Sequence, residues 1–255
     1  MTSAAYSVDV VPMFQDNYLF SLRFGNEVIL IDPGDFIAVR EYLERENIRP
    51  MAILNTHHHP DHVGGNKELY KIYGCPIYGN AKDKARLPGV TDFFTPGDQL
   101  QVGPLNVEVI DVSGHTIGHC AFYDAFAKKL FVGDSLFSLG CGRMFEGNPE
   151  MMLGALQRLT QLPASTLVYA AHEYTLANGA FSLTVDSKNT ILQDYVKRCR
   201  ELREIDIPTV PFNLGLQLSC NPFLRTADET IQAHFQTQND EVATFAAMRT
   251  AKDNF

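Results

Sequence analysis

Short apolar runs alternate with amphipathic stretches along the first two thirds of the chain, a pattern that predicts strands interleaved with helices. Each run is rich in Val, Ile, Leu or Phe, and the run at residues 28–31 ends at the turn signal Asp32-Pro33-Gly34. A helix is predicted over residues 36–46, because Phe36, Val39 and Leu43 recur on one helical face. The predicted strands cover residues 8–11, 18–22, 28–31, 51–54, 105–110, 121–123, 130–132 and 166–170.

The pattern changes after His172, where helical periodicity replaces the short apolar runs. Helices are predicted over residues 151–162, 188–205, 231–235 and 242–251. Many short strands with interleaved helices predict an α/β fold in which helices cover the sheets, followed by a small helical appendage. We therefore expect two domains, at residues 1–172 and 173–255.

Composition narrows the choice of function classes. The chain has 255 residues, 45% of them hydrophobic and 20% charged, which is typical of a globular protein and excludes a disordered or fibrous one. A formal net charge of −9 argues against a nucleic-acid partner, because such proteins gain affinity by neutralising phosphates. Without a secretory pattern at the start or an apolar run of about 20 residues, we expect a cytoplasmic protein with no membrane partner. Five scattered cysteines without a Cys-x-x-Cys pair argue against a disulfide framework.

Four of the eight histidines fall within residues 57–62, directly after an apolar run that predicts a strand. In extended backbone His57 and His59 point to the same side, so both imidazoles could bind one cation. Asp61 and His62 follow Pro60, where the chain turns, and could face a second cation beside the first. Imidazole and carboxylate groups are suitable ligands for zinc, iron or manganese. The alternative is a histidine-rich surface loop with incidental affinity for metal.

Three further candidate ligands stand at or soon after the ends of predicted strands. His115 follows the strand at residues 105–110 in a Gly-His turn, Asp134 follows the strand at 130–132, and His172 follows the strand at 166–170. Functional side chains on loops at the ends of buried strands are typical of α/β active sites. These positions favour a metal site over the surface loop.

The order of these motifs resembles the metallo-β-lactamase superfamily and, within it, the glyoxalase II family of hydroxyacylglutathione hydrolases. Finer matches span almost the whole chain: Gln15-Asp16-Asn17-Tyr18, Gly133-Asp134-Ser135-Leu136-Phe137, Cys141-Gly142-Arg143, Phe145-Glu146-Gly147, Ala171-His172-Glu173-Tyr174-Thr175 and Asn221-Pro222-Phe223-Leu224-Arg225. The resemblance implies an αβ/βα sandwich of two mixed sheets flanked by helices, with a C-terminal all-helical domain that helps to bind glutathione.

The resemblance also assigns metal ligands residue by residue. It gives one ion to His57, His59 and His115, a second ion to Asp61, His62 and His172, and both ions to Asp134 as a bridge. Zinc is the first expectation for both ions, with iron or manganese as alternatives. His119 is expected to be structural, and His58 and His234 to be ordinary surface histidines.

Two adjacent divalent ions would lower the pKa of a shared water toward neutrality and supply hydroxide. Asp61 and Asp134 are the expected catalytic residues, and Asp61 could orient the nucleophile. A thioester suits such a site because its thiolate leaving group needs no strong general acid. The resemblance therefore implies hydrolysis of S-(2-hydroxyacyl)glutathione, such as S-D-lactoylglutathione, to glutathione and a 2-hydroxy acid, a step in methylglyoxal detoxification.

By the same resemblance, Arg143, Tyr174, Arg249 and Lys252 are expected to contact glutathione. Arg249 and Lys252 share a helical face, although such a pair is more often a solvated helix end. Position 143 is Arg where several relatives have Lys, and position 145 is Phe where some have Tyr, which suggests altered contacts with glutathione.

Other functions remain open at this stage. A glutathione persulfide dioxygenase with a single iron, another hydrolase of the same fold and a non-enzymatic metal-binding protein are the alternatives. The helical C-terminal region and its Arg249/Lys252 pair favour the hydrolase. We expect a monomer that acts on a small molecule.

Overall fold

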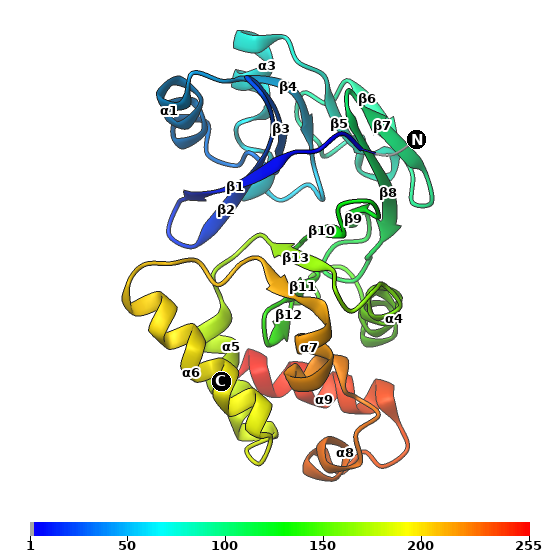
Figure 1. Cartoon of the computed structure of the whole chain (residues 1–255). Helices are drawn as coiled ribbons and strands as arrows, with labels where there is room; N and C mark the ends of the chain where they lie inside the picture. Colours follow the sequence, from blue (N-terminus) through cyan, green and yellow to red (C-terminus); the bar gives the residue numbers. More distant parts are fainter. Residues whose placement is uncertain (1–2) are drawn as a thin grey trace. The chain divides into compact units, whose positions relative to one another are not determined.

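The computed structural model describes residues 3–255, which form two compact units (Figure 1). The first unit comprises Met1–Asp111 and Gly118–Gly133, and the second comprises Val112–Ile117 and Asp134–Phe255. The expected domain boundary after His172 is a division of the sequence and stays a prediction.

A six-stranded sheet forms the centre of the first unit, with its strands in sequence order. The chain pairs β1, β2 and β3 antiparallel, whereas β4, β5 and β6 add in parallel. Helix-forming segments between these parallel strands provide the crossovers that parallel pairing requires. The strands are β1 Ser7–Met13, β2 Asn17–Phe24, β3 Glu27–Ile31, β4 Arg49–Leu54, β5 Ile77–Asn80 and β6 Asp92–Phe94.

Helices α1 (Phe36–Glu46) and α3 (Asn66–Tyr73) pack against each other beside this sheet (Figure 1). The predicted helix at residues 36–46 is confirmed with the same bounds. Asp35 fixes its start by accepting hydrogen bonds from the amides of Ile37 and Ala38, and Asn47 ends it in the left-handed conformation. Val39 and Leu43 are buried with Leu30 and Ile53 in one hydrophobic cluster.

An antiparallel group of strands completes the β structure of the first unit, in the order β10-β9-β8-β7. These strands are β7 Gln99–Val102, β8 Leu105–Asp111, β9 Cys120–Asp124 and β10 Lys129–Gly133. The predicted strands within this group are confirmed at β8, β9 and β10. The sequence analysis missed β5, β6 and β7, which are short and partly polar.

The second unit is mostly helical and carries the end of the chain. Its helices are α4 Pro149–Thr160, α5 Thr175–Val185, α6 Thr190–Glu204, α7 Leu214–Cys220, α8 Glu229–Phe235 and α9 Glu241–Asp253. Its strands are short: β11 Leu136–Phe137 pairs with β12 Gly140–Cys141, and β13 Leu167–Ala170 pairs with β14 Phe212–Asn213. The expected helical C-terminal region is confirmed, with α5, α7 and the two-residue strand β14 as additions.

Packing within the second unit fixes α9, which carries Arg249 and Lys252. Helix α9 contacts α4 and α8, and Phe245 and Met248 on its inner face are fully buried. Leu139, Leu192, Val196 and Cys220 form a separate apolar cluster around α6. Among residues 3–255, no helix has the length and apolar character that crossing a membrane requires.

The N-terminal cap of α9 gives a test of how firmly this helix is held. Asp240 accepts a hydrogen bond of 2.8 Å from the amide of Ala243. We expect Asp240→Ala to lower the free energy of unfolding by about 1 kcal/mol, because a helix amide loses its partner. Urea unfolding measures the change. The control Glu201→Ala removes an exposed carboxylate from α6 and should alter stability by less than about 0.5 kcal/mol. Equal midpoints for both variants would contradict the capping role.

Candidate functional site

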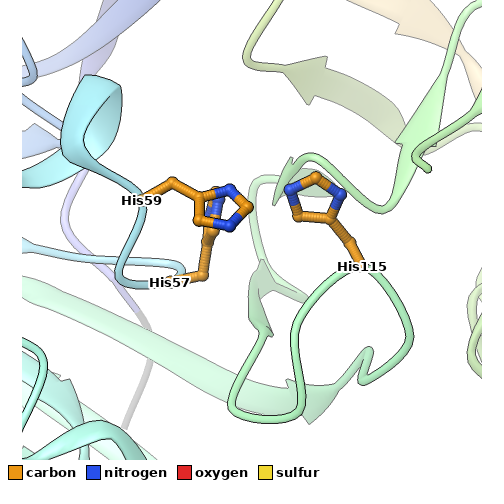
Figure 2. A group of neighbouring side chains, drawn as sticks. All are labelled: His57, His59 and His115. Atoms are coloured by element: carbon orange, nitrogen blue, oxygen red, sulfur yellow. The ribbon is translucent and has the colours of Figure 1, made fainter. Parts of the chain in front are cut away.

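The histidine cluster lies where β4 ends and the short helix α2 (Pro60–Val63) begins. His59 is the extended residue before α2, and its ring centroid lies 4.7 Å from that of His57. Figure 2 shows these two rings beside each other, as the alternation of side chains in extended backbone predicts. The ring of His62 lies 4.1 Å from that of His57. Three imidazoles of the first unit therefore gather around one point.

A buried carboxylate organises this cluster. Asp32 follows β3 in the left-handed conformation, with φ of 56°, and accepts hydrogen bonds from the amide and hydroxyl of Thr56 at 2.8 and 2.6 Å. Its Oδ2 also lies 3.0 Å from Nδ1 of His62. A carboxylate on one ring nitrogen fixes the tautomer and leaves Nε2 to act as a ligand. The sequence analysis treated Asp32 only as part of a turn and missed this role.

Asp61 is held from a different strand. Nδ2 of Asn17, the first residue of β2, donates a hydrogen bond of 2.9 Å to Oδ2 of Asp61. The same Oδ2 lies 3.5 Å from Nε2 of His62. Two residues that are adjacent in the sequence therefore direct a carboxylate oxygen and an imidazole nitrogen to one place. Asn17 entered the sequence analysis only as a member of a matched segment.

The two other histidines near this cluster differ in their environment. His119 is fully buried, and its ring stacks on that of His57 with centroids 4.5 Å apart and planes inclined by 16°. The expectation of an ordinary surface residue is wrong for His58, whose side chain is only 15% exposed. Its Nδ1 lies 3.3 Å from Oδ2 of the buried Asp83, because the alternation that points His57 and His59 together turns His58 toward the opposite side.

The second unit brings His115, Asp134 and His172 together. Asp134 follows β10 directly, and its Oδ2 lies 3.4 Å from Nε2 of His115 and 3.4 Å from Nε2 of His172. Nδ1 of His115, also drawn in Figure 2, lies 2.8 Å from the carbonyl oxygen of Arg143. That contact leaves Nε2 of His115 facing the carboxylate. Oδ2 of Asp134 thus lies between the imidazoles of His115 and His172, and the three residues come from separate segments of the chain.

Close backbone packing makes the turn at His115 possible. Gly114 has φ of 152°, and a Cβ atom there would lie 2.9 Å from the Cα of Met152 in α4. A side chain at this position would push the turn away from the helix. The glycine before His115 is therefore needed because the backbone of the turn lies close against α4.

Aromatic rings flank these histidines. The ring of Tyr174 stacks on that of His172, with centroids 4.7 Å apart and planes inclined by 8°. The ring of Phe145 meets His115 edge-on at 5.2 Å and is 64% exposed. The stacking restricts the orientation of His172, while Tyr174 remains partly open to solvent.

A cavity of about 470 Å³ in the second unit is lined by all four residues expected to contact glutathione. His115 and Asp134 line the same cavity, so candidate ligands and cationic side chains share one space. The lining residues are His115, Asp134, Phe137, Cys141, Gly142, Arg143, Phe145, Tyr174, Ala177, Asn178, Arg249 and Lys252. The size is in the usual range for a small-molecule site.

Comparison with known proteins decides the family. A sequence model described as the metallo-beta-lactamase superfamily matches residues 12–172, and one described as the hydroxyacylglutathione hydrolase C-terminus matches residues 173–255. A protein of Nitrosomonas eutropha named hydroxyacylglutathione hydrolase is 43% identical over 258 aligned residues, which cover 97% of this chain and 99% of that protein. The chain belongs to the hydroxyacylglutathione hydrolase family. The members of this family are hydrolases, so the chain is an enzyme of that class.

Solved structures agree with the metallo-β-lactamase fold. The BLEG-1 B3 metallo-beta-lactamase superposes with a TM-score of 0.66 at 23% identity, covering 86% of this chain and 99% of that one. TTHA1623 in a di-iron-bound form gives a TM-score of 0.61 at 25% identity, covering 86% and 100%. The expected metallo-β-lactamase fold with a helical C-terminal region is therefore confirmed.

The donors present in this chain suit divalent metal ions. The first unit provides imidazole and carboxylate groups, and the ligand atoms of Asp32, His57 and His62 lie within 4.8 Å of one another. Because Asp32 already accepts a hydrogen bond from Thr56 and contacts Nδ1 of His62, it is placed to orient a candidate ligand more than to bind a metal itself. Nitrogen and oxygen donors of this kind accept several transition metals, so the residues do not select one metal.

The cationic wall of the cavity contains one residue that is more buried than the sequence indicated. Arg249 is only 4% exposed. Its Nη1 donates a hydrogen bond of 2.8 Å to the carbonyl oxygen of Cys141, and its Nη2 donates one of 2.9 Å to Oδ1 of Asp253. Its guanidinium also stacks over the ring of Phe223 at 5.3 Å. Burial raises the pKa of the Cys141 thiol to about 11, so this cysteine stays protonated at neutral pH.

The buried carboxylate predicts how the metal centre responds to mutation. Asp32→Asn keeps a side chain that tolerates φ of 56° but removes the charge that faces His62. We expect metal affinity to fall about 10- to 100-fold, because His62 loses the group that orients it. Competition with a fluorescent chelator measures the change in the folded variant.

The matched control is Glu41→Gln, which removes an exposed carboxylate from α1 in the same unit. It should leave metal affinity unchanged. If Asp32→Asn binds metal as tightly as this control, Asp32 has no orienting role.

Proposed function

We propose that this chain hydrolyses the thioester of S-(2-hydroxyacyl)glutathione, such as S-D-lactoylglutathione, to glutathione and a 2-hydroxy acid. One observation carries the proposal: Arg143, Lys252 and Tyr174 line the same cavity as His115 and Asp134. A glutathione conjugate bears two carboxylates beside a reactive thioester, so binding groups and reacting groups must lie close together. The full-length similarity to a protein named hydroxyacylglutathione hydrolase supports the same reaction.

For the metal centre, we propose that His57 and His59 hold one ion with His115, and that Asp61 and His62 hold the second with His172. Asp134 is the proposed bridge. Its Oδ2 supports this role, because it faces Nε2 of both His115 and His172. The contact between Asp61 and Nε2 of His62 supports the second group.

Two divalent ions held there would supply a nucleophilic water at neutral pH and polarise the thioester carbonyl. Asp61 accepts a hydrogen bond from Asn17 through Oδ2, which fixes the carboxylate that orients the attacking water. The oxygen of water adds to the carbonyl carbon, the C–S bond breaks and the sulfur leaves as a thiolate, which takes up the proton that the water has lost. A thiol pKa near 8.5 makes this departure easy without a strong acid. Cys141 in the cavity lining is itself a weak acid, because burial raises the pKa of its thiol to about 11.

The cations of the cavity have separate proposed tasks. Lys252 and Arg143 are exposed enough to receive the carboxylates of glutathione, whereas Arg249 is held by Cys141 and Asp253. Tyr174 offers a hydroxyl and a ring surface at the rim. Phe145 provides an apolar surface next to His115, at a position where a Tyr would add a hydroxyl.

Zinc is the proposed metal, with iron and manganese as alternatives, since the donors do not discriminate among them. The solved relative TTHA1623 was described in a di-iron-bound form. We also propose that the protein acts in the cytoplasm as a monomer, in methylglyoxal detoxification. All five cysteines are free and buried, which suits a reducing compartment.

Thiol release from S-D-lactoylglutathione tests the reaction. We expect the metal-loaded protein to release free thiol, and the chelated protein to be at least about 100-fold slower, because water then lacks its activating ions. A thiol reagent measures the rate, and adding zinc, iron or manganese back should restore it.

Two outcomes would contradict this proposal. Equal thiol release by the chelated protein would exclude the metal mechanism. Oxygen consumption with glutathione persulfide, without hydrolysis of the thioester, would support the single-iron dioxygenase instead.

Substrate anchoring gives a separate prediction at Lys252. We expect Lys252→Ala to raise KM about 5- to 20-fold and to change kcat by less than about threefold, because this cation contacts the substrate away from the reacting bond. Steady-state kinetics with S-D-lactoylglutathione separates the two constants. Lys252→Arg should restore most of the affinity, and the control Lys197→Ala on the exposed face of α6 should change neither constant. An unchanged KM for Lys252→Ala would remove Lys252 from the binding site.

A further inference from the structure

A carboxylate stands among the cations of the cavity. Asp253 is the last residue of α9, and its Oδ1 lies 2.9 Å from Nη2 of Arg249 and 3.5 Å from Nε of Arg143. The sequence analysis passed over this residue, because an acid at the end of a helix is unremarkable by itself. Its position between two guanidinium groups is the position that a ligand carboxylate would take.

The electrostatics of Lys252 show how concentrated the positive charge is. Burial lowers the pKa of Lys252, and the charges of Arg249 and Arg143 lower it further, while Asp253 raises it. Three cations therefore repel one another in a small space, and Asp253 offsets part of that repulsion. Removing this offset would leave a stronger attraction for anions.

We propose that Asp253 sets the affinity of the cavity for anionic ligands, because its carboxylate competes with a carboxylate of the substrate for Arg143. The proposal deepens the proposed function and rests on it. Asp253 is a specificity-determining residue in this scheme, since it acts on the cations that receive the substrate. Its presence weakens binding, which favours release of the glutathione product.

Asp253 can compete with the substrate because it is not needed to hold Arg249 in place, which is fixed by other contacts. Nη1 of Arg249 is bound to the Cys141 carbonyl, and the guanidinium is buried over the ring of Phe223. Arg143 has a side chain that is 64% exposed, and Asp253 is 39% exposed, so their contact opens at little cost. A substrate carboxylate of equal charge can therefore take over Arg143.

The test is Asp253→Asn in the metal-loaded protein, with glutathione as the probe and calorimetry as the measurement. The amide oxygen still accepts a hydrogen bond from Arg249, so the change removes charge and keeps the shape. We expect glutathione to bind roughly three- to tenfold more tightly, as loss of one unit charge in a partly solvated site predicts. Glutathione glycyl ethyl ester, which lacks one carboxylate, should gain less.

The matched control is Asp194→Asn, which makes the same charge change on the exposed surface of α6. It should leave the affinity for glutathione unchanged. Equal or weaker binding of glutathione by Asp253→Asn would overturn the proposal, and so would an equal gain for the ester. If the wild-type protein itself binds no glutathione, the proposed function has failed instead.

Should Asp253→Asn fold poorly, as judged by its thermal melt, Asp253→Ser gives the same test with a smaller polar side chain. Tighter binding of glutathione by this variant supports the competitor role. Unchanged or weaker binding contradicts it.

Discussion

The contact between Asp32 and His62 is the constraint on which the first half of the site depends. An imidazole buried at the end of a strand needs a partner for one nitrogen before the other can bind a ligand. Asp32 provides that partner and, through Thr56, also fixes the backbone from which His57 departs. To do so it adopts a left-handed conformation that costs free energy, which the three polar contacts offset.

Much of the fold could be predicted because its strands are buried on both faces. Val28, Ile29, Leu30 and Ile31 in β3 are all buried, so the run is continuous and easily recognised. The alternation of His57 and His59 followed from the same backbone geometry and is present in the structure. The short strand β6, Asp92–Phe94, could not be predicted, since two of its residues are exposed and its pairing with β5 determines its conformation.

The sequence pattern could not identify contacts between side chains that lie far apart in the sequence. Nothing in the spacing indicates that Asp32 serves His62, or that Asn17 holds Asp61, because these contacts depend on the register of strands. The environment of Arg249 could not be predicted from the sequence either. Helical spacing predicted one shared helical face for Arg249 and Lys252, and both side chains line the cavity. Only packing reveals that Arg249 is buried and bound while Lys252 is accessible.

The cavity of the second unit illustrates how affinity and turnover constrain each other. A site built only from Arg143, Arg249 and Lys252 would bind a dianionic product as strongly as the substrate and release it slowly. Asp253 among these cations weakens the binding of the substrate and of the product by the same charge effect. It does so without moving any group that faces His115 and Asp134. In the proposed scheme, binding strength can therefore vary at α9 while Asp134, after β10, and His115, in the turn at Gly114, keep their positions. The control of affinity is then separate from the control of chemistry.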